Sequence, residues 1–208
     1  MKFKDFKNNS EMLLHFGLKI ESSKFINFEQ VKPVELSEAI LSDIEFSLAN
    51  RGDADMEAYA CEAFIFPILR EAWKRNPQAK LFSHPQIKYE DLILVPDYVV
   101  TSRDISGLNA FQKPLLITVE AKNDDYAQGW SDACKQLIVA RLINENNEIP
   151  IYALVSIGEG WQIGKLEGNR IYKHPIPLSI NDPNELLGVL DYIFADCVKT
   201  AERFGMYD

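Results

Sequence analysis

Two near-continuous apolar segments, Leu115–Ala121 and Ile151–Ile157, place the strongest constraint on how this chain can fold. Such segments predict strands covered on both faces, because a strand with one face in water alternates apolar and polar residues. Between them, Tyr126–Asn144 carries apolar residues at helical spacing. Strand, helix and strand in succession predict a right-handed crossover and a parallel strand pair. We therefore expect an α/β fold, with a mixed sheet of four or five strands flanked by helices.

Shorter signals extend this pattern on both sides. Glycines at 158, 160 and 168 mark turns between short β-prone segments. The further predicted strands are Leu92–Val100, Trp161–Leu166 and Arg170–Lys173. The further predicted helices are 33–50, beginning on Pro33, 53–75, with a kink or break at Pro67, and 182–205. Asp53 and Asp55 suit the start of helix 53–75. Asp182 and Glu185 suit the start of helix 182–205, and Gly205 suits its end.

Composition narrows the classes of function. The net charge of −9 argues against a protein that coats nucleic acid or an anionic membrane by bulk charge. It leaves room for an enzyme with a local nucleic-acid cleft. Three dispersed cysteines are too few for a disulfide framework, so we expect a reducing, cytoplasmic compartment. The sequence has neither a signal-peptide pattern nor an apolar run long enough for a transmembrane helix, and no membrane association is expected.

Several common catalytic motifs are absent from the sequence. It contains no phosphate-binding loop, no dinucleotide-binding glycine pattern, no H-E-x-x-H and no G-x-S-x-G. The three histidines, His15, His84 and His174, fall in unrelated segments, and we interpret them as incidental surface or loop residues. The remaining candidates for chemistry are carboxylates and lysines on the predicted strands.

Glu120 and Lys122 come at the end of the first apolar strand. Side chains alternate between the faces of a strand, so these two share a face with Thr118. The simplest interpretation is an ion pair at a strand end. An ion pair does not explain why Asp97 lies inside the preceding apolar segment, directly after Pro96. A proline cannot donate to a strand ladder, so it marks a bulge or a strand edge, which often re-aims a side chain beside an active site.

If the two strands are neighbours, Asp97 and Glu120 converge. Two carboxylates and a strand carbonyl form a hard oxygen site suited to Mg²⁺ or Mn²⁺. Lys122 would lie beside such a site, where an ammonium can orient or deprotonate a metal-bound water. The sequence therefore predicts a divalent-metal centre at one end of the sheet.

Pro96-Asp97 followed by Glu120-Ala121-Lys122 resembles the PD-(D/E)XK nuclease superfamily, whose members share the restriction-endonuclease-like fold. Gln136 stands on the following helix, 14 residues after Lys122, where many members place a glutamine that braces the site. Some members extend this to Q-x-x-x-Y; here Ala140 replaces the tyrosine.

The preceding helix resembles the first helix of the nuclease domain in type I restriction motor subunits. There a glutamate precedes an apolar-Pro-x-Leu segment and points toward the metal. Glu57 fits that position best, with Glu62 as the alternative, and both could equally be solvated helix charges. The resemblance covers roughly residues 53–173 of a single domain, with 1–50 as a helical N-terminal extension that could also hold a short strand, and 182–205 as a C-terminal helix.

The resemblance implies a magnesium-dependent or manganese-dependent nuclease. Asp97, Glu120, the Ala121 carbonyl and Glu57 would bind the metal, while Lys122 and Gln136 would assist catalysis. Nucleic acid, with DNA favoured, is the implied partner, and a homodimer is an open alternative. The basic residues proposed to contact phosphates are Arg70, Lys74, Arg75, Lys80 and Lys88. Two other classes stay open: an inactive nucleic-acid-binding or regulatory module with the same fold, and a protein-interaction protein.

Overall fold

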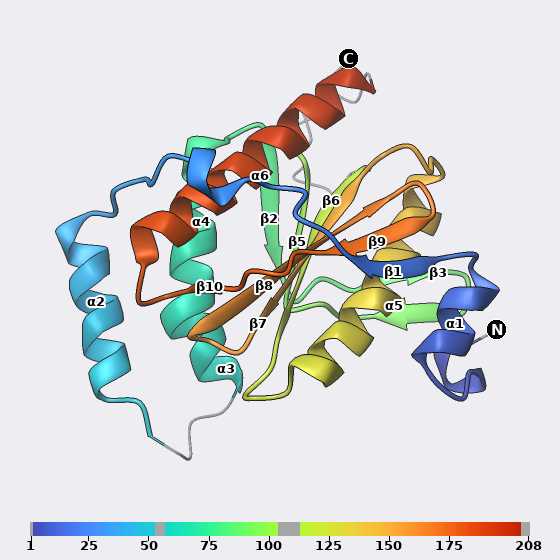
Figure 1. The fold of residues 1–208 in the computed structure, drawn as a ribbon, viewed down its shortest axis with the longest axis horizontal. Helices are drawn as coiled ribbons and strands as arrows, with labels where there is room; N and C mark the ends of the chain where they lie inside the picture. The colour runs from blue at the N-terminus through green and yellow to red at the C-terminus, as the bar shows by residue number, and fades with distance from the viewer. Residues whose placement is uncertain (1, 53–56, 104–112, 205–208) are drawn as a thin grey trace.

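A large mixed sheet forms the centre of the protein (Figure 1). The computed structural model describes residues 2–52, 57–103 and 113–204. Seven strands follow one another in the order β1-β9-β8-β7-β6-β5-β2, and β10 pairs with β8. The eight strands are β1 (Lys19–Ser22), β2 (Ala79–Ser83), β5 (Tyr98–Ser102), β6 (Leu115–Ala121), β7 (Ile151–Ser156), β8 (Gly160–Glu167), β9 (Arg170–Lys173) and β10 (Leu178–Ser179). A separate ribbon contains β3 (Ile87–Tyr89) and β4 (Leu92–Leu94).

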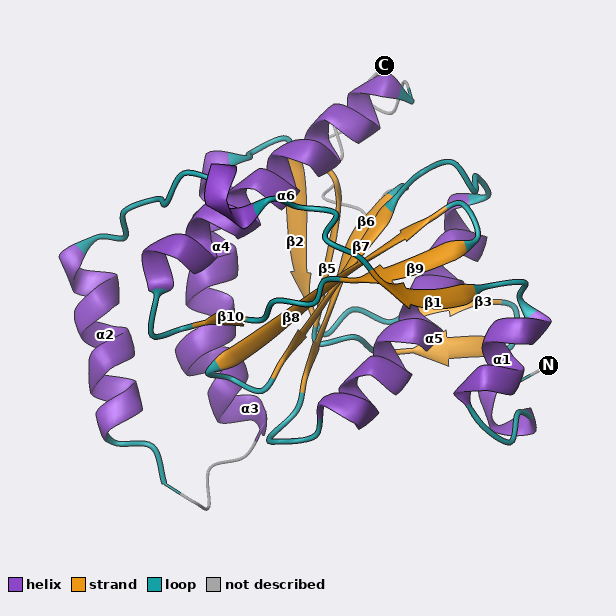
Figure 2. Cartoon of the chain, viewed as in Figure 1, coloured by secondary structure: helices purple, strands orange, loops and turns teal. Residues whose placement is uncertain are grey.

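Helices cover both faces of this sheet (Figure 2). The α-helices are α1 (Asn9–His15), α2 (Glu38–Ala49), α3 (Glu57–Ala60), α4 (Phe66–Arg75), α5 (Tyr126–Asn144) and α6 (Pro183–Arg203). A π-helical turn, Cys61–Ile65, joins α3 to α4, and 3₁₀ turns span Phe3–Asp5 and Phe28–Gln30. One core layer lies between the sheet and α4 with α6, and the other between the sheet and α5.

The centre of the sheet agrees with the sequence pattern. All seven residues of β6 and all six of β7 are buried, as expected for strands covered on both faces. β6 and β7 are parallel, and α5 connects them over the predicted range. The fold is therefore mixed α/β, as predicted.

The sheet is larger than the four or five strands expected. Three short strands that carry weak sequence signals, β1, β2 and β10, join it. The predicted strand Leu92–Val100 is wrong as a single element, because it divides into β4 and β5 on either side of Pro96. Pro96 lacks the N–H that a ladder requires, so pairing stops there.

Two predicted helix starts also need correction. α2 begins at Glu38 instead of Pro33, because the Ser37 hydroxyl caps it by accepting from the Ile40 N–H. The segment before it is extended and pairs with α6, where Val34 N–H donates to the Asn184 carbonyl. α6 begins at Pro183, but the Asp182 side chain makes no cap hydrogen bond. The predicted caps at 53–55 and the helix end at Gly205 lie outside the described residues.

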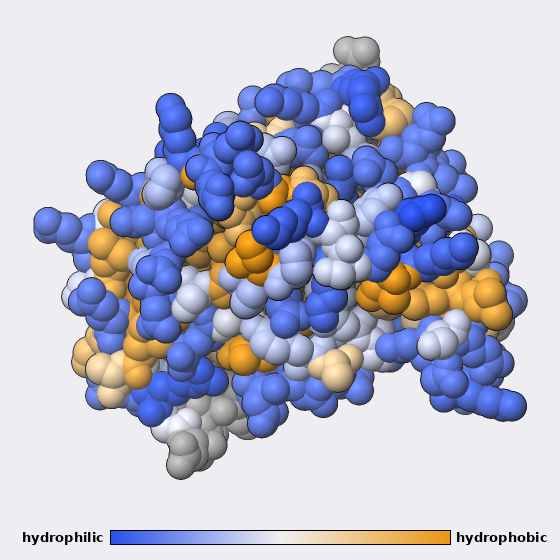
Figure 3. Space-filling model, viewed as in Figure 1, coloured by the Kyte–Doolittle hydropathy of each residue, from blue (hydrophilic) through white to orange (hydrophobic). Residues whose placement is uncertain are grey.

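Hydrophilic side chains cover most of the face seen in Figure 3, with hydrophobic patches over α2 and near α1 and β1. Phe46 on α2, Leu14 on α1 and Ile20 on β1 are exposed hydrophobic residues in these regions. In the part of the chain that the structure describes, no helix has the length and apolar character needed to cross a membrane.

Candidate active site

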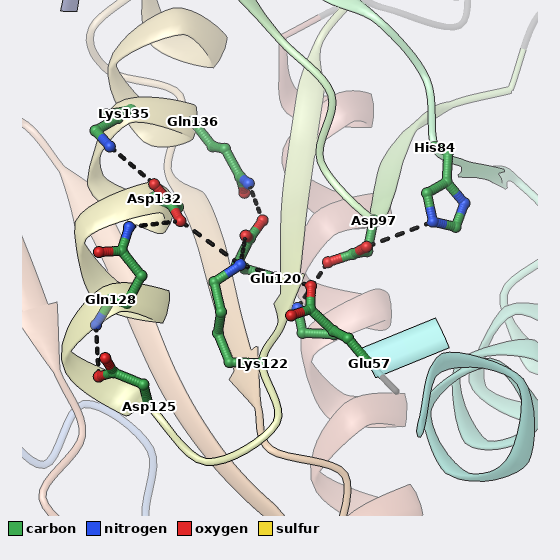
Figure 4. A network of polar contacts seen from close by, with 11 residues as sticks. Glu57, His84, Asp97, Glu120, Lys122, Asp125, Gln128, Asp132, Lys135 and Gln136 are labelled. Carbon is green, nitrogen blue, oxygen red and sulfur yellow. Dashed lines mark hydrogen bonds and ion pairs between the residues drawn. The ribbon is translucent and has the colours of Figure 1, made fainter. Parts of the chain in front are cut away.

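The two acidic residues predicted on neighbouring strands meet at one end of the sheet (Figure 4). β5 and β6 are antiparallel, with Tyr98 opposite Val119, so Asp97 comes just before β5 beside the end of β6. Oδ2 of Asp97 accepts a hydrogen bond of 2.7 Å from the backbone N–H of Ala121. The interruption at Pro96 thus turns a carboxylate toward the last residues of β6.

Glu120 and Lys122 share the face that α5 covers. Oε1 of Glu120 accepts a hydrogen bond from the Lys122 ammonium, and Oε2 accepts one from the side-chain amide of Gln136 on α5. Glu120 is only 7% exposed and Gln136 only 3%. The Lys122 N–H donates to the Ser156 carbonyl in β7 at 2.8 Å, so the ladder itself fixes where Lys122 stands. The shared face of Glu120 and Lys122 agrees with strand periodicity, while Gln136 contacts Glu120 from α5.

Two more carboxylates face the Lys122 ammonium. Its Nζ lies 3.6 Å from Oε1 of Glu57 at the start of α3 and 3.6 Å from Oδ2 of Asp132 on α5. Asp132 is held in turn by Lys135 Nζ at 2.8 Å and by Gln128 Nε2 at 3.0 Å. One ammonium is thus surrounded by acidic groups from β6, α3 and α5.

Burial raises the pKa of two carboxylates of the cluster, Glu120 and Glu57, because their hydrogen bonds and ion pairs do not offset the loss of solvation. It raises the pKa of Glu120 to about 7, although the hydrogen bond from Lys122 opposes the shift and the charge of Asp97 adds to it. Burial also raises the pKa of Glu57. Burial acts the same way on Asp132, but the hydrogen bonds from Lys135 and Gln128 outweigh it and lower its pKa. The Lys122 pKa is raised, because its acidic neighbours outweigh the cost of burial.

The cluster contains the oxygen ligands of a hard-cation site, but they are not arranged around a common point. Carboxylate and carbonyl oxygens are the ligands that Mg²⁺ and Mn²⁺ prefer. Within residues 2–52, 57–103 and 113–204, however, no three His, Cys, Asp or Glu side chains are grouped as metal ligands. Both oxygens of Glu120 are instead used by Lys122 and Gln136. A cation that binds Glu120 would therefore lie beside the Lys122 ammonium or displace it.

A pocket of about 380 Å³ adjoins Asp97, with Glu62, Phe66, His84 and Tyr98 in its wall. His84 Nε2 lies 3.4 Å from Oδ1 of Asp97, and the His84 N–H donates to the Asp97 carbonyl at 2.7 Å. Of the two alternatives on the preceding helix, Glu57 thus reaches Lys122, whereas Glu62 faces this neighbouring pocket.

Three of the five basic residues proposed for phosphate contacts, Arg70, Lys74 and Lys80, line one further pocket. Arg75 is elsewhere: its Nε lies 3.1 Å from Oδ1 of Asp191 on α6. Lys88 lies on β3 in the two-stranded ribbon. The five basic residues of 70–89 therefore do not form one surface.

Sequence reasoning missed Asp132 and His84. Asp132 carried a usable signal, because it lies four residues before Gln136 and so on the same side of α5. His84 was set aside as incidental, and its contact with Asp97 depends on the antiparallel pairing of β2 with β5. His174, also set aside, is buried, and its Nε2 lies 2.9 Å from the Ile26 carbonyl oxygen, which is a structural contact.

Comparison with known proteins does not assign this site. No family model matches the chain, and no curated protein matches its sequence. The functional argument therefore rests on the residues described above.

Proposed function

We propose that this protein is a metal-dependent nuclease that hydrolyses phosphodiester bonds of nucleic acid, with DNA as the expected substrate. The observation that supports the proposal best is the convergence of Asp97, Glu120 and Lys122. Asp97 comes from the segment before β5, and Glu120 and Lys122 from the end of β6, so two distant parts of the chain meet at one end of the sheet. Buried charges are costly unless they are paired, and a strand end needs no such cluster for stability.

The charge and position of each residue indicate the role that it would have in the reaction. Lys122 would stabilise the negative charge that develops on the phosphate, or hold the attacking water. Gln136 would keep Glu120 oriented through the hydrogen bond that it already donates. Glu57, at 3.6 Å from the ammonium, would help to position Lys122 or take part in metal binding through a water.

Asp97, Glu120 and the Ala121 carbonyl are the proposed metal ligands. A bound Mg²⁺ or Mn²⁺ would activate water and neutralise charge on the phosphate. The donor set suits such a cation, and the raised pKa of Glu120 indicates a carboxylate whose charge is poorly compensated in its absence. Releasing Lys122 from Glu120 would also free the ammonium to face the phosphate.

An inactive binding module is the second candidate. Two observations favour it. Lys122 and Glu120 are hydrogen-bonded to each other, and the chain carries a net charge of −9, which disfavours general binding of a polyanion. A module of this kind would bind nucleic acid or a partner without cleaving it.

Metal titration combined with a cleavage assay separates the two candidates. We expect the purified protein to cleave at least one of single-stranded DNA, duplex DNA or RNA when Mg²⁺ or Mn²⁺ is added, and to stop when the metal is chelated. Asp97→Asn removes a ligand charge, so metal affinity and cleavage should fall together. Lys19→Gln, on the far edge strand β1, is the control and should retain both. If no substrate is cleaved with either metal, the nuclease proposal is wrong and the binding module is favoured.

A further inference from the structure

A second pocket, of about 460 Å³, opens between α4 and β2. We call it the basic pocket and define it by Arg70, Trp73, Lys74, Lys80 and Arg103. Three of the cations and the tryptophan come from α4 and β2, while Arg103 directly follows β5. The pocket therefore combines positive charge with an aromatic surface, which is the combination that binds nucleic-acid strands.

Aromatic rings contact two of the four cations of this pocket, Lys80 and Arg70. The Trp73 ring is itself fixed, because its Nε1 donates to the Ala79 carbonyl at 2.8 Å. Lys80 Nζ lies 4.9 Å from the centre of that ring and 5.7 Å from the Phe82 ring. The Arg70 guanidinium lies 5.7 Å from the Phe66 ring. Cations ordered in this way lose less side-chain entropy when an anion binds.

The pocket also keeps hydrogen-bonding capacity for an acceptor. Glu71 contacts Arg70 at 3.6 Å and Lys74 at 2.7 Å, which sets one carboxylate against four cations. The Arg70 atom that faces Glu71 is Nε, which is shielded from solvent and makes no hydrogen bond among the described residues. The Arg70 and Lys74 side chains are 41% and 59% exposed, so both can still donate to a phosphate oxygen.

The position of the basic pocket connects it with the candidate active site. β2 runs from Ala79 and Lys80 at the basic pocket to Ser83, which lines the pocket beside Asp97. α4 spans the same interval, with Phe66 at the active-site end and Trp73 at the other. Four residue steps along a strand correspond to about 13 Å. The two pockets therefore lie close enough for one nucleic-acid strand to contact both.

We propose that the basic pocket binds a backbone phosphate of the nucleic-acid substrate, on the same strand as the bond that is cut. This inference rests on the proposed function for the position of the cut. The contact is to phosphate and carries no base specificity. Arg103 and Trp73 thereby join Arg70, Lys74 and Lys80 in this contact, whereas Arg75 and Lys88 do not take part.

Binding measured without turnover tests the pocket on its own. The probe is a fluorescently labelled DNA oligonucleotide, single-stranded or annealed to its complement, titrated in EDTA and followed by anisotropy at several salt concentrations. Lys74→Gln/Lys80→Gln should weaken binding about 10-fold and reduce the slope of log K against log salt by about 1–2, as expected for lost phosphate contacts. Arg103→Gln should act in the same direction. The matched control is Lys4→Gln/Lys19→Gln, two exposed lysines near the opposite sheet edge, which should change neither quantity.

The outcomes separate this inference from the nuclease proposal. If the pocket variants bind and depend on salt like the unmodified protein, the phosphate site is wrong even where cleavage is observed. Equal losses in the pocket variants and in the control would also overturn it, because they would reflect general charge. Selective loss of binding in a protein that never cleaves would support the pocket and reject the nuclease proposal. Thermal melting of each variant confirms that the fold is intact.

Discussion

Lys122 is the residue on which the candidate site depends. Its ammonium contacts Glu120 and lies 3.6 Å from both Glu57 and Asp132, so three carboxylates share the charges of Lys122 and of Lys135, which pairs with Asp132. Such an excess of acid raises the free energy of the folded protein at neutral pH unless a further cation enters. Two of the four groups, Glu120 and Lys122, were predictable as partners from strand periodicity alone. Asp132 could be placed on the side of α5 that carries Gln136, but its distance from Lys122 depends on how α5 packs on β6 and β7.

The raised pKa of Glu120 predicts a specific pH dependence of stability. Its pKa in the folded protein is about 7, against 4.5 as its ordinary value, so between these limits the folded protein binds more protons than the unfolded chain. The free energy of unfolding should therefore fall as pH rises from 4.5 through about 7, by more than ~1 kcal/mol, since one pKa unit is worth about 1.4 kcal/mol. Urea unfolding in EDTA across this range measures it. Glu120→Gln should lose this part of the decline, while the contribution of Glu57 stays; identical pH profiles for the two proteins would show that Glu120 titrates normally.

At the scale of elements, predictability followed the length of the apolar pattern. β6, β7 and α5 agree with the sequence because long apolar runs and a sustained helical period leave few alternatives. The shorter predicted strands Trp161–Leu166 and Arg170–Lys173 also agree, with β8 and β9. Segments interrupted by a proline are irregular. The helix containing Pro67 continues through a π-helical turn at Cys61–Ile65, and the strand containing Pro96 breaks. The break at Pro96 places Asp97 beside the end of β6. The strand pattern is therefore interrupted at a proposed site residue.

A glycine in α6 provides a test of the packing between α6 and the N-terminal segment. A Cβ on Gly188 would lie 2.4 Å from the Lys32 carbonyl oxygen and 3.1 Å from Cα of Pro33, both backbone atoms. Gly188→Ala should thus destabilise the protein by about 1–3 kcal/mol despite the better helix propensity of alanine, because overpacking outweighs the gain of about 1 kcal/mol. Denaturant unfolding measures the change. Lys199→Ala, at an exposed position of the same helix, should stay within about 0.5 kcal/mol. An unchanged or higher stability in Gly188→Ala would mean that the N-terminal segment is not packed against α6 as described.

At the scale of the whole molecule, the sheet joins segments that are far apart in sequence. β1 pairs in parallel with β9, and β2 pairs with β5 at the opposite edge. β1 has the sequence Lys-Ile-Glu-Ser, which carries no strand signal of its own, so its place is decided by the partner strand. The same dependence applies to the candidate site, which joins β6, α5 and α3, and to the basic pocket, which joins α4 and β2. The central strands and the site residues Glu120, Lys122 and Gln136 could be predicted from the sequence. The contacts of His84, Asp132 and Arg103 depend on how the elements pack in three dimensions.

Cleavage by Lys122→Ala tests the central claim most directly. The rate of phosphodiester hydrolysis is measured for this variant and for the unmodified protein, at a Mn²⁺ concentration that saturates both. Lysine is not a cation ligand, and its removal takes a positive charge away from the proposed metal site, so metal affinity should be retained or increased. The cleavage rate should nevertheless fall by about 10²-fold or more, as expected when a charge that stabilises the transition state is lost. Full cleavage by Lys122→Ala, or loss of its metal affinity, would contradict the account.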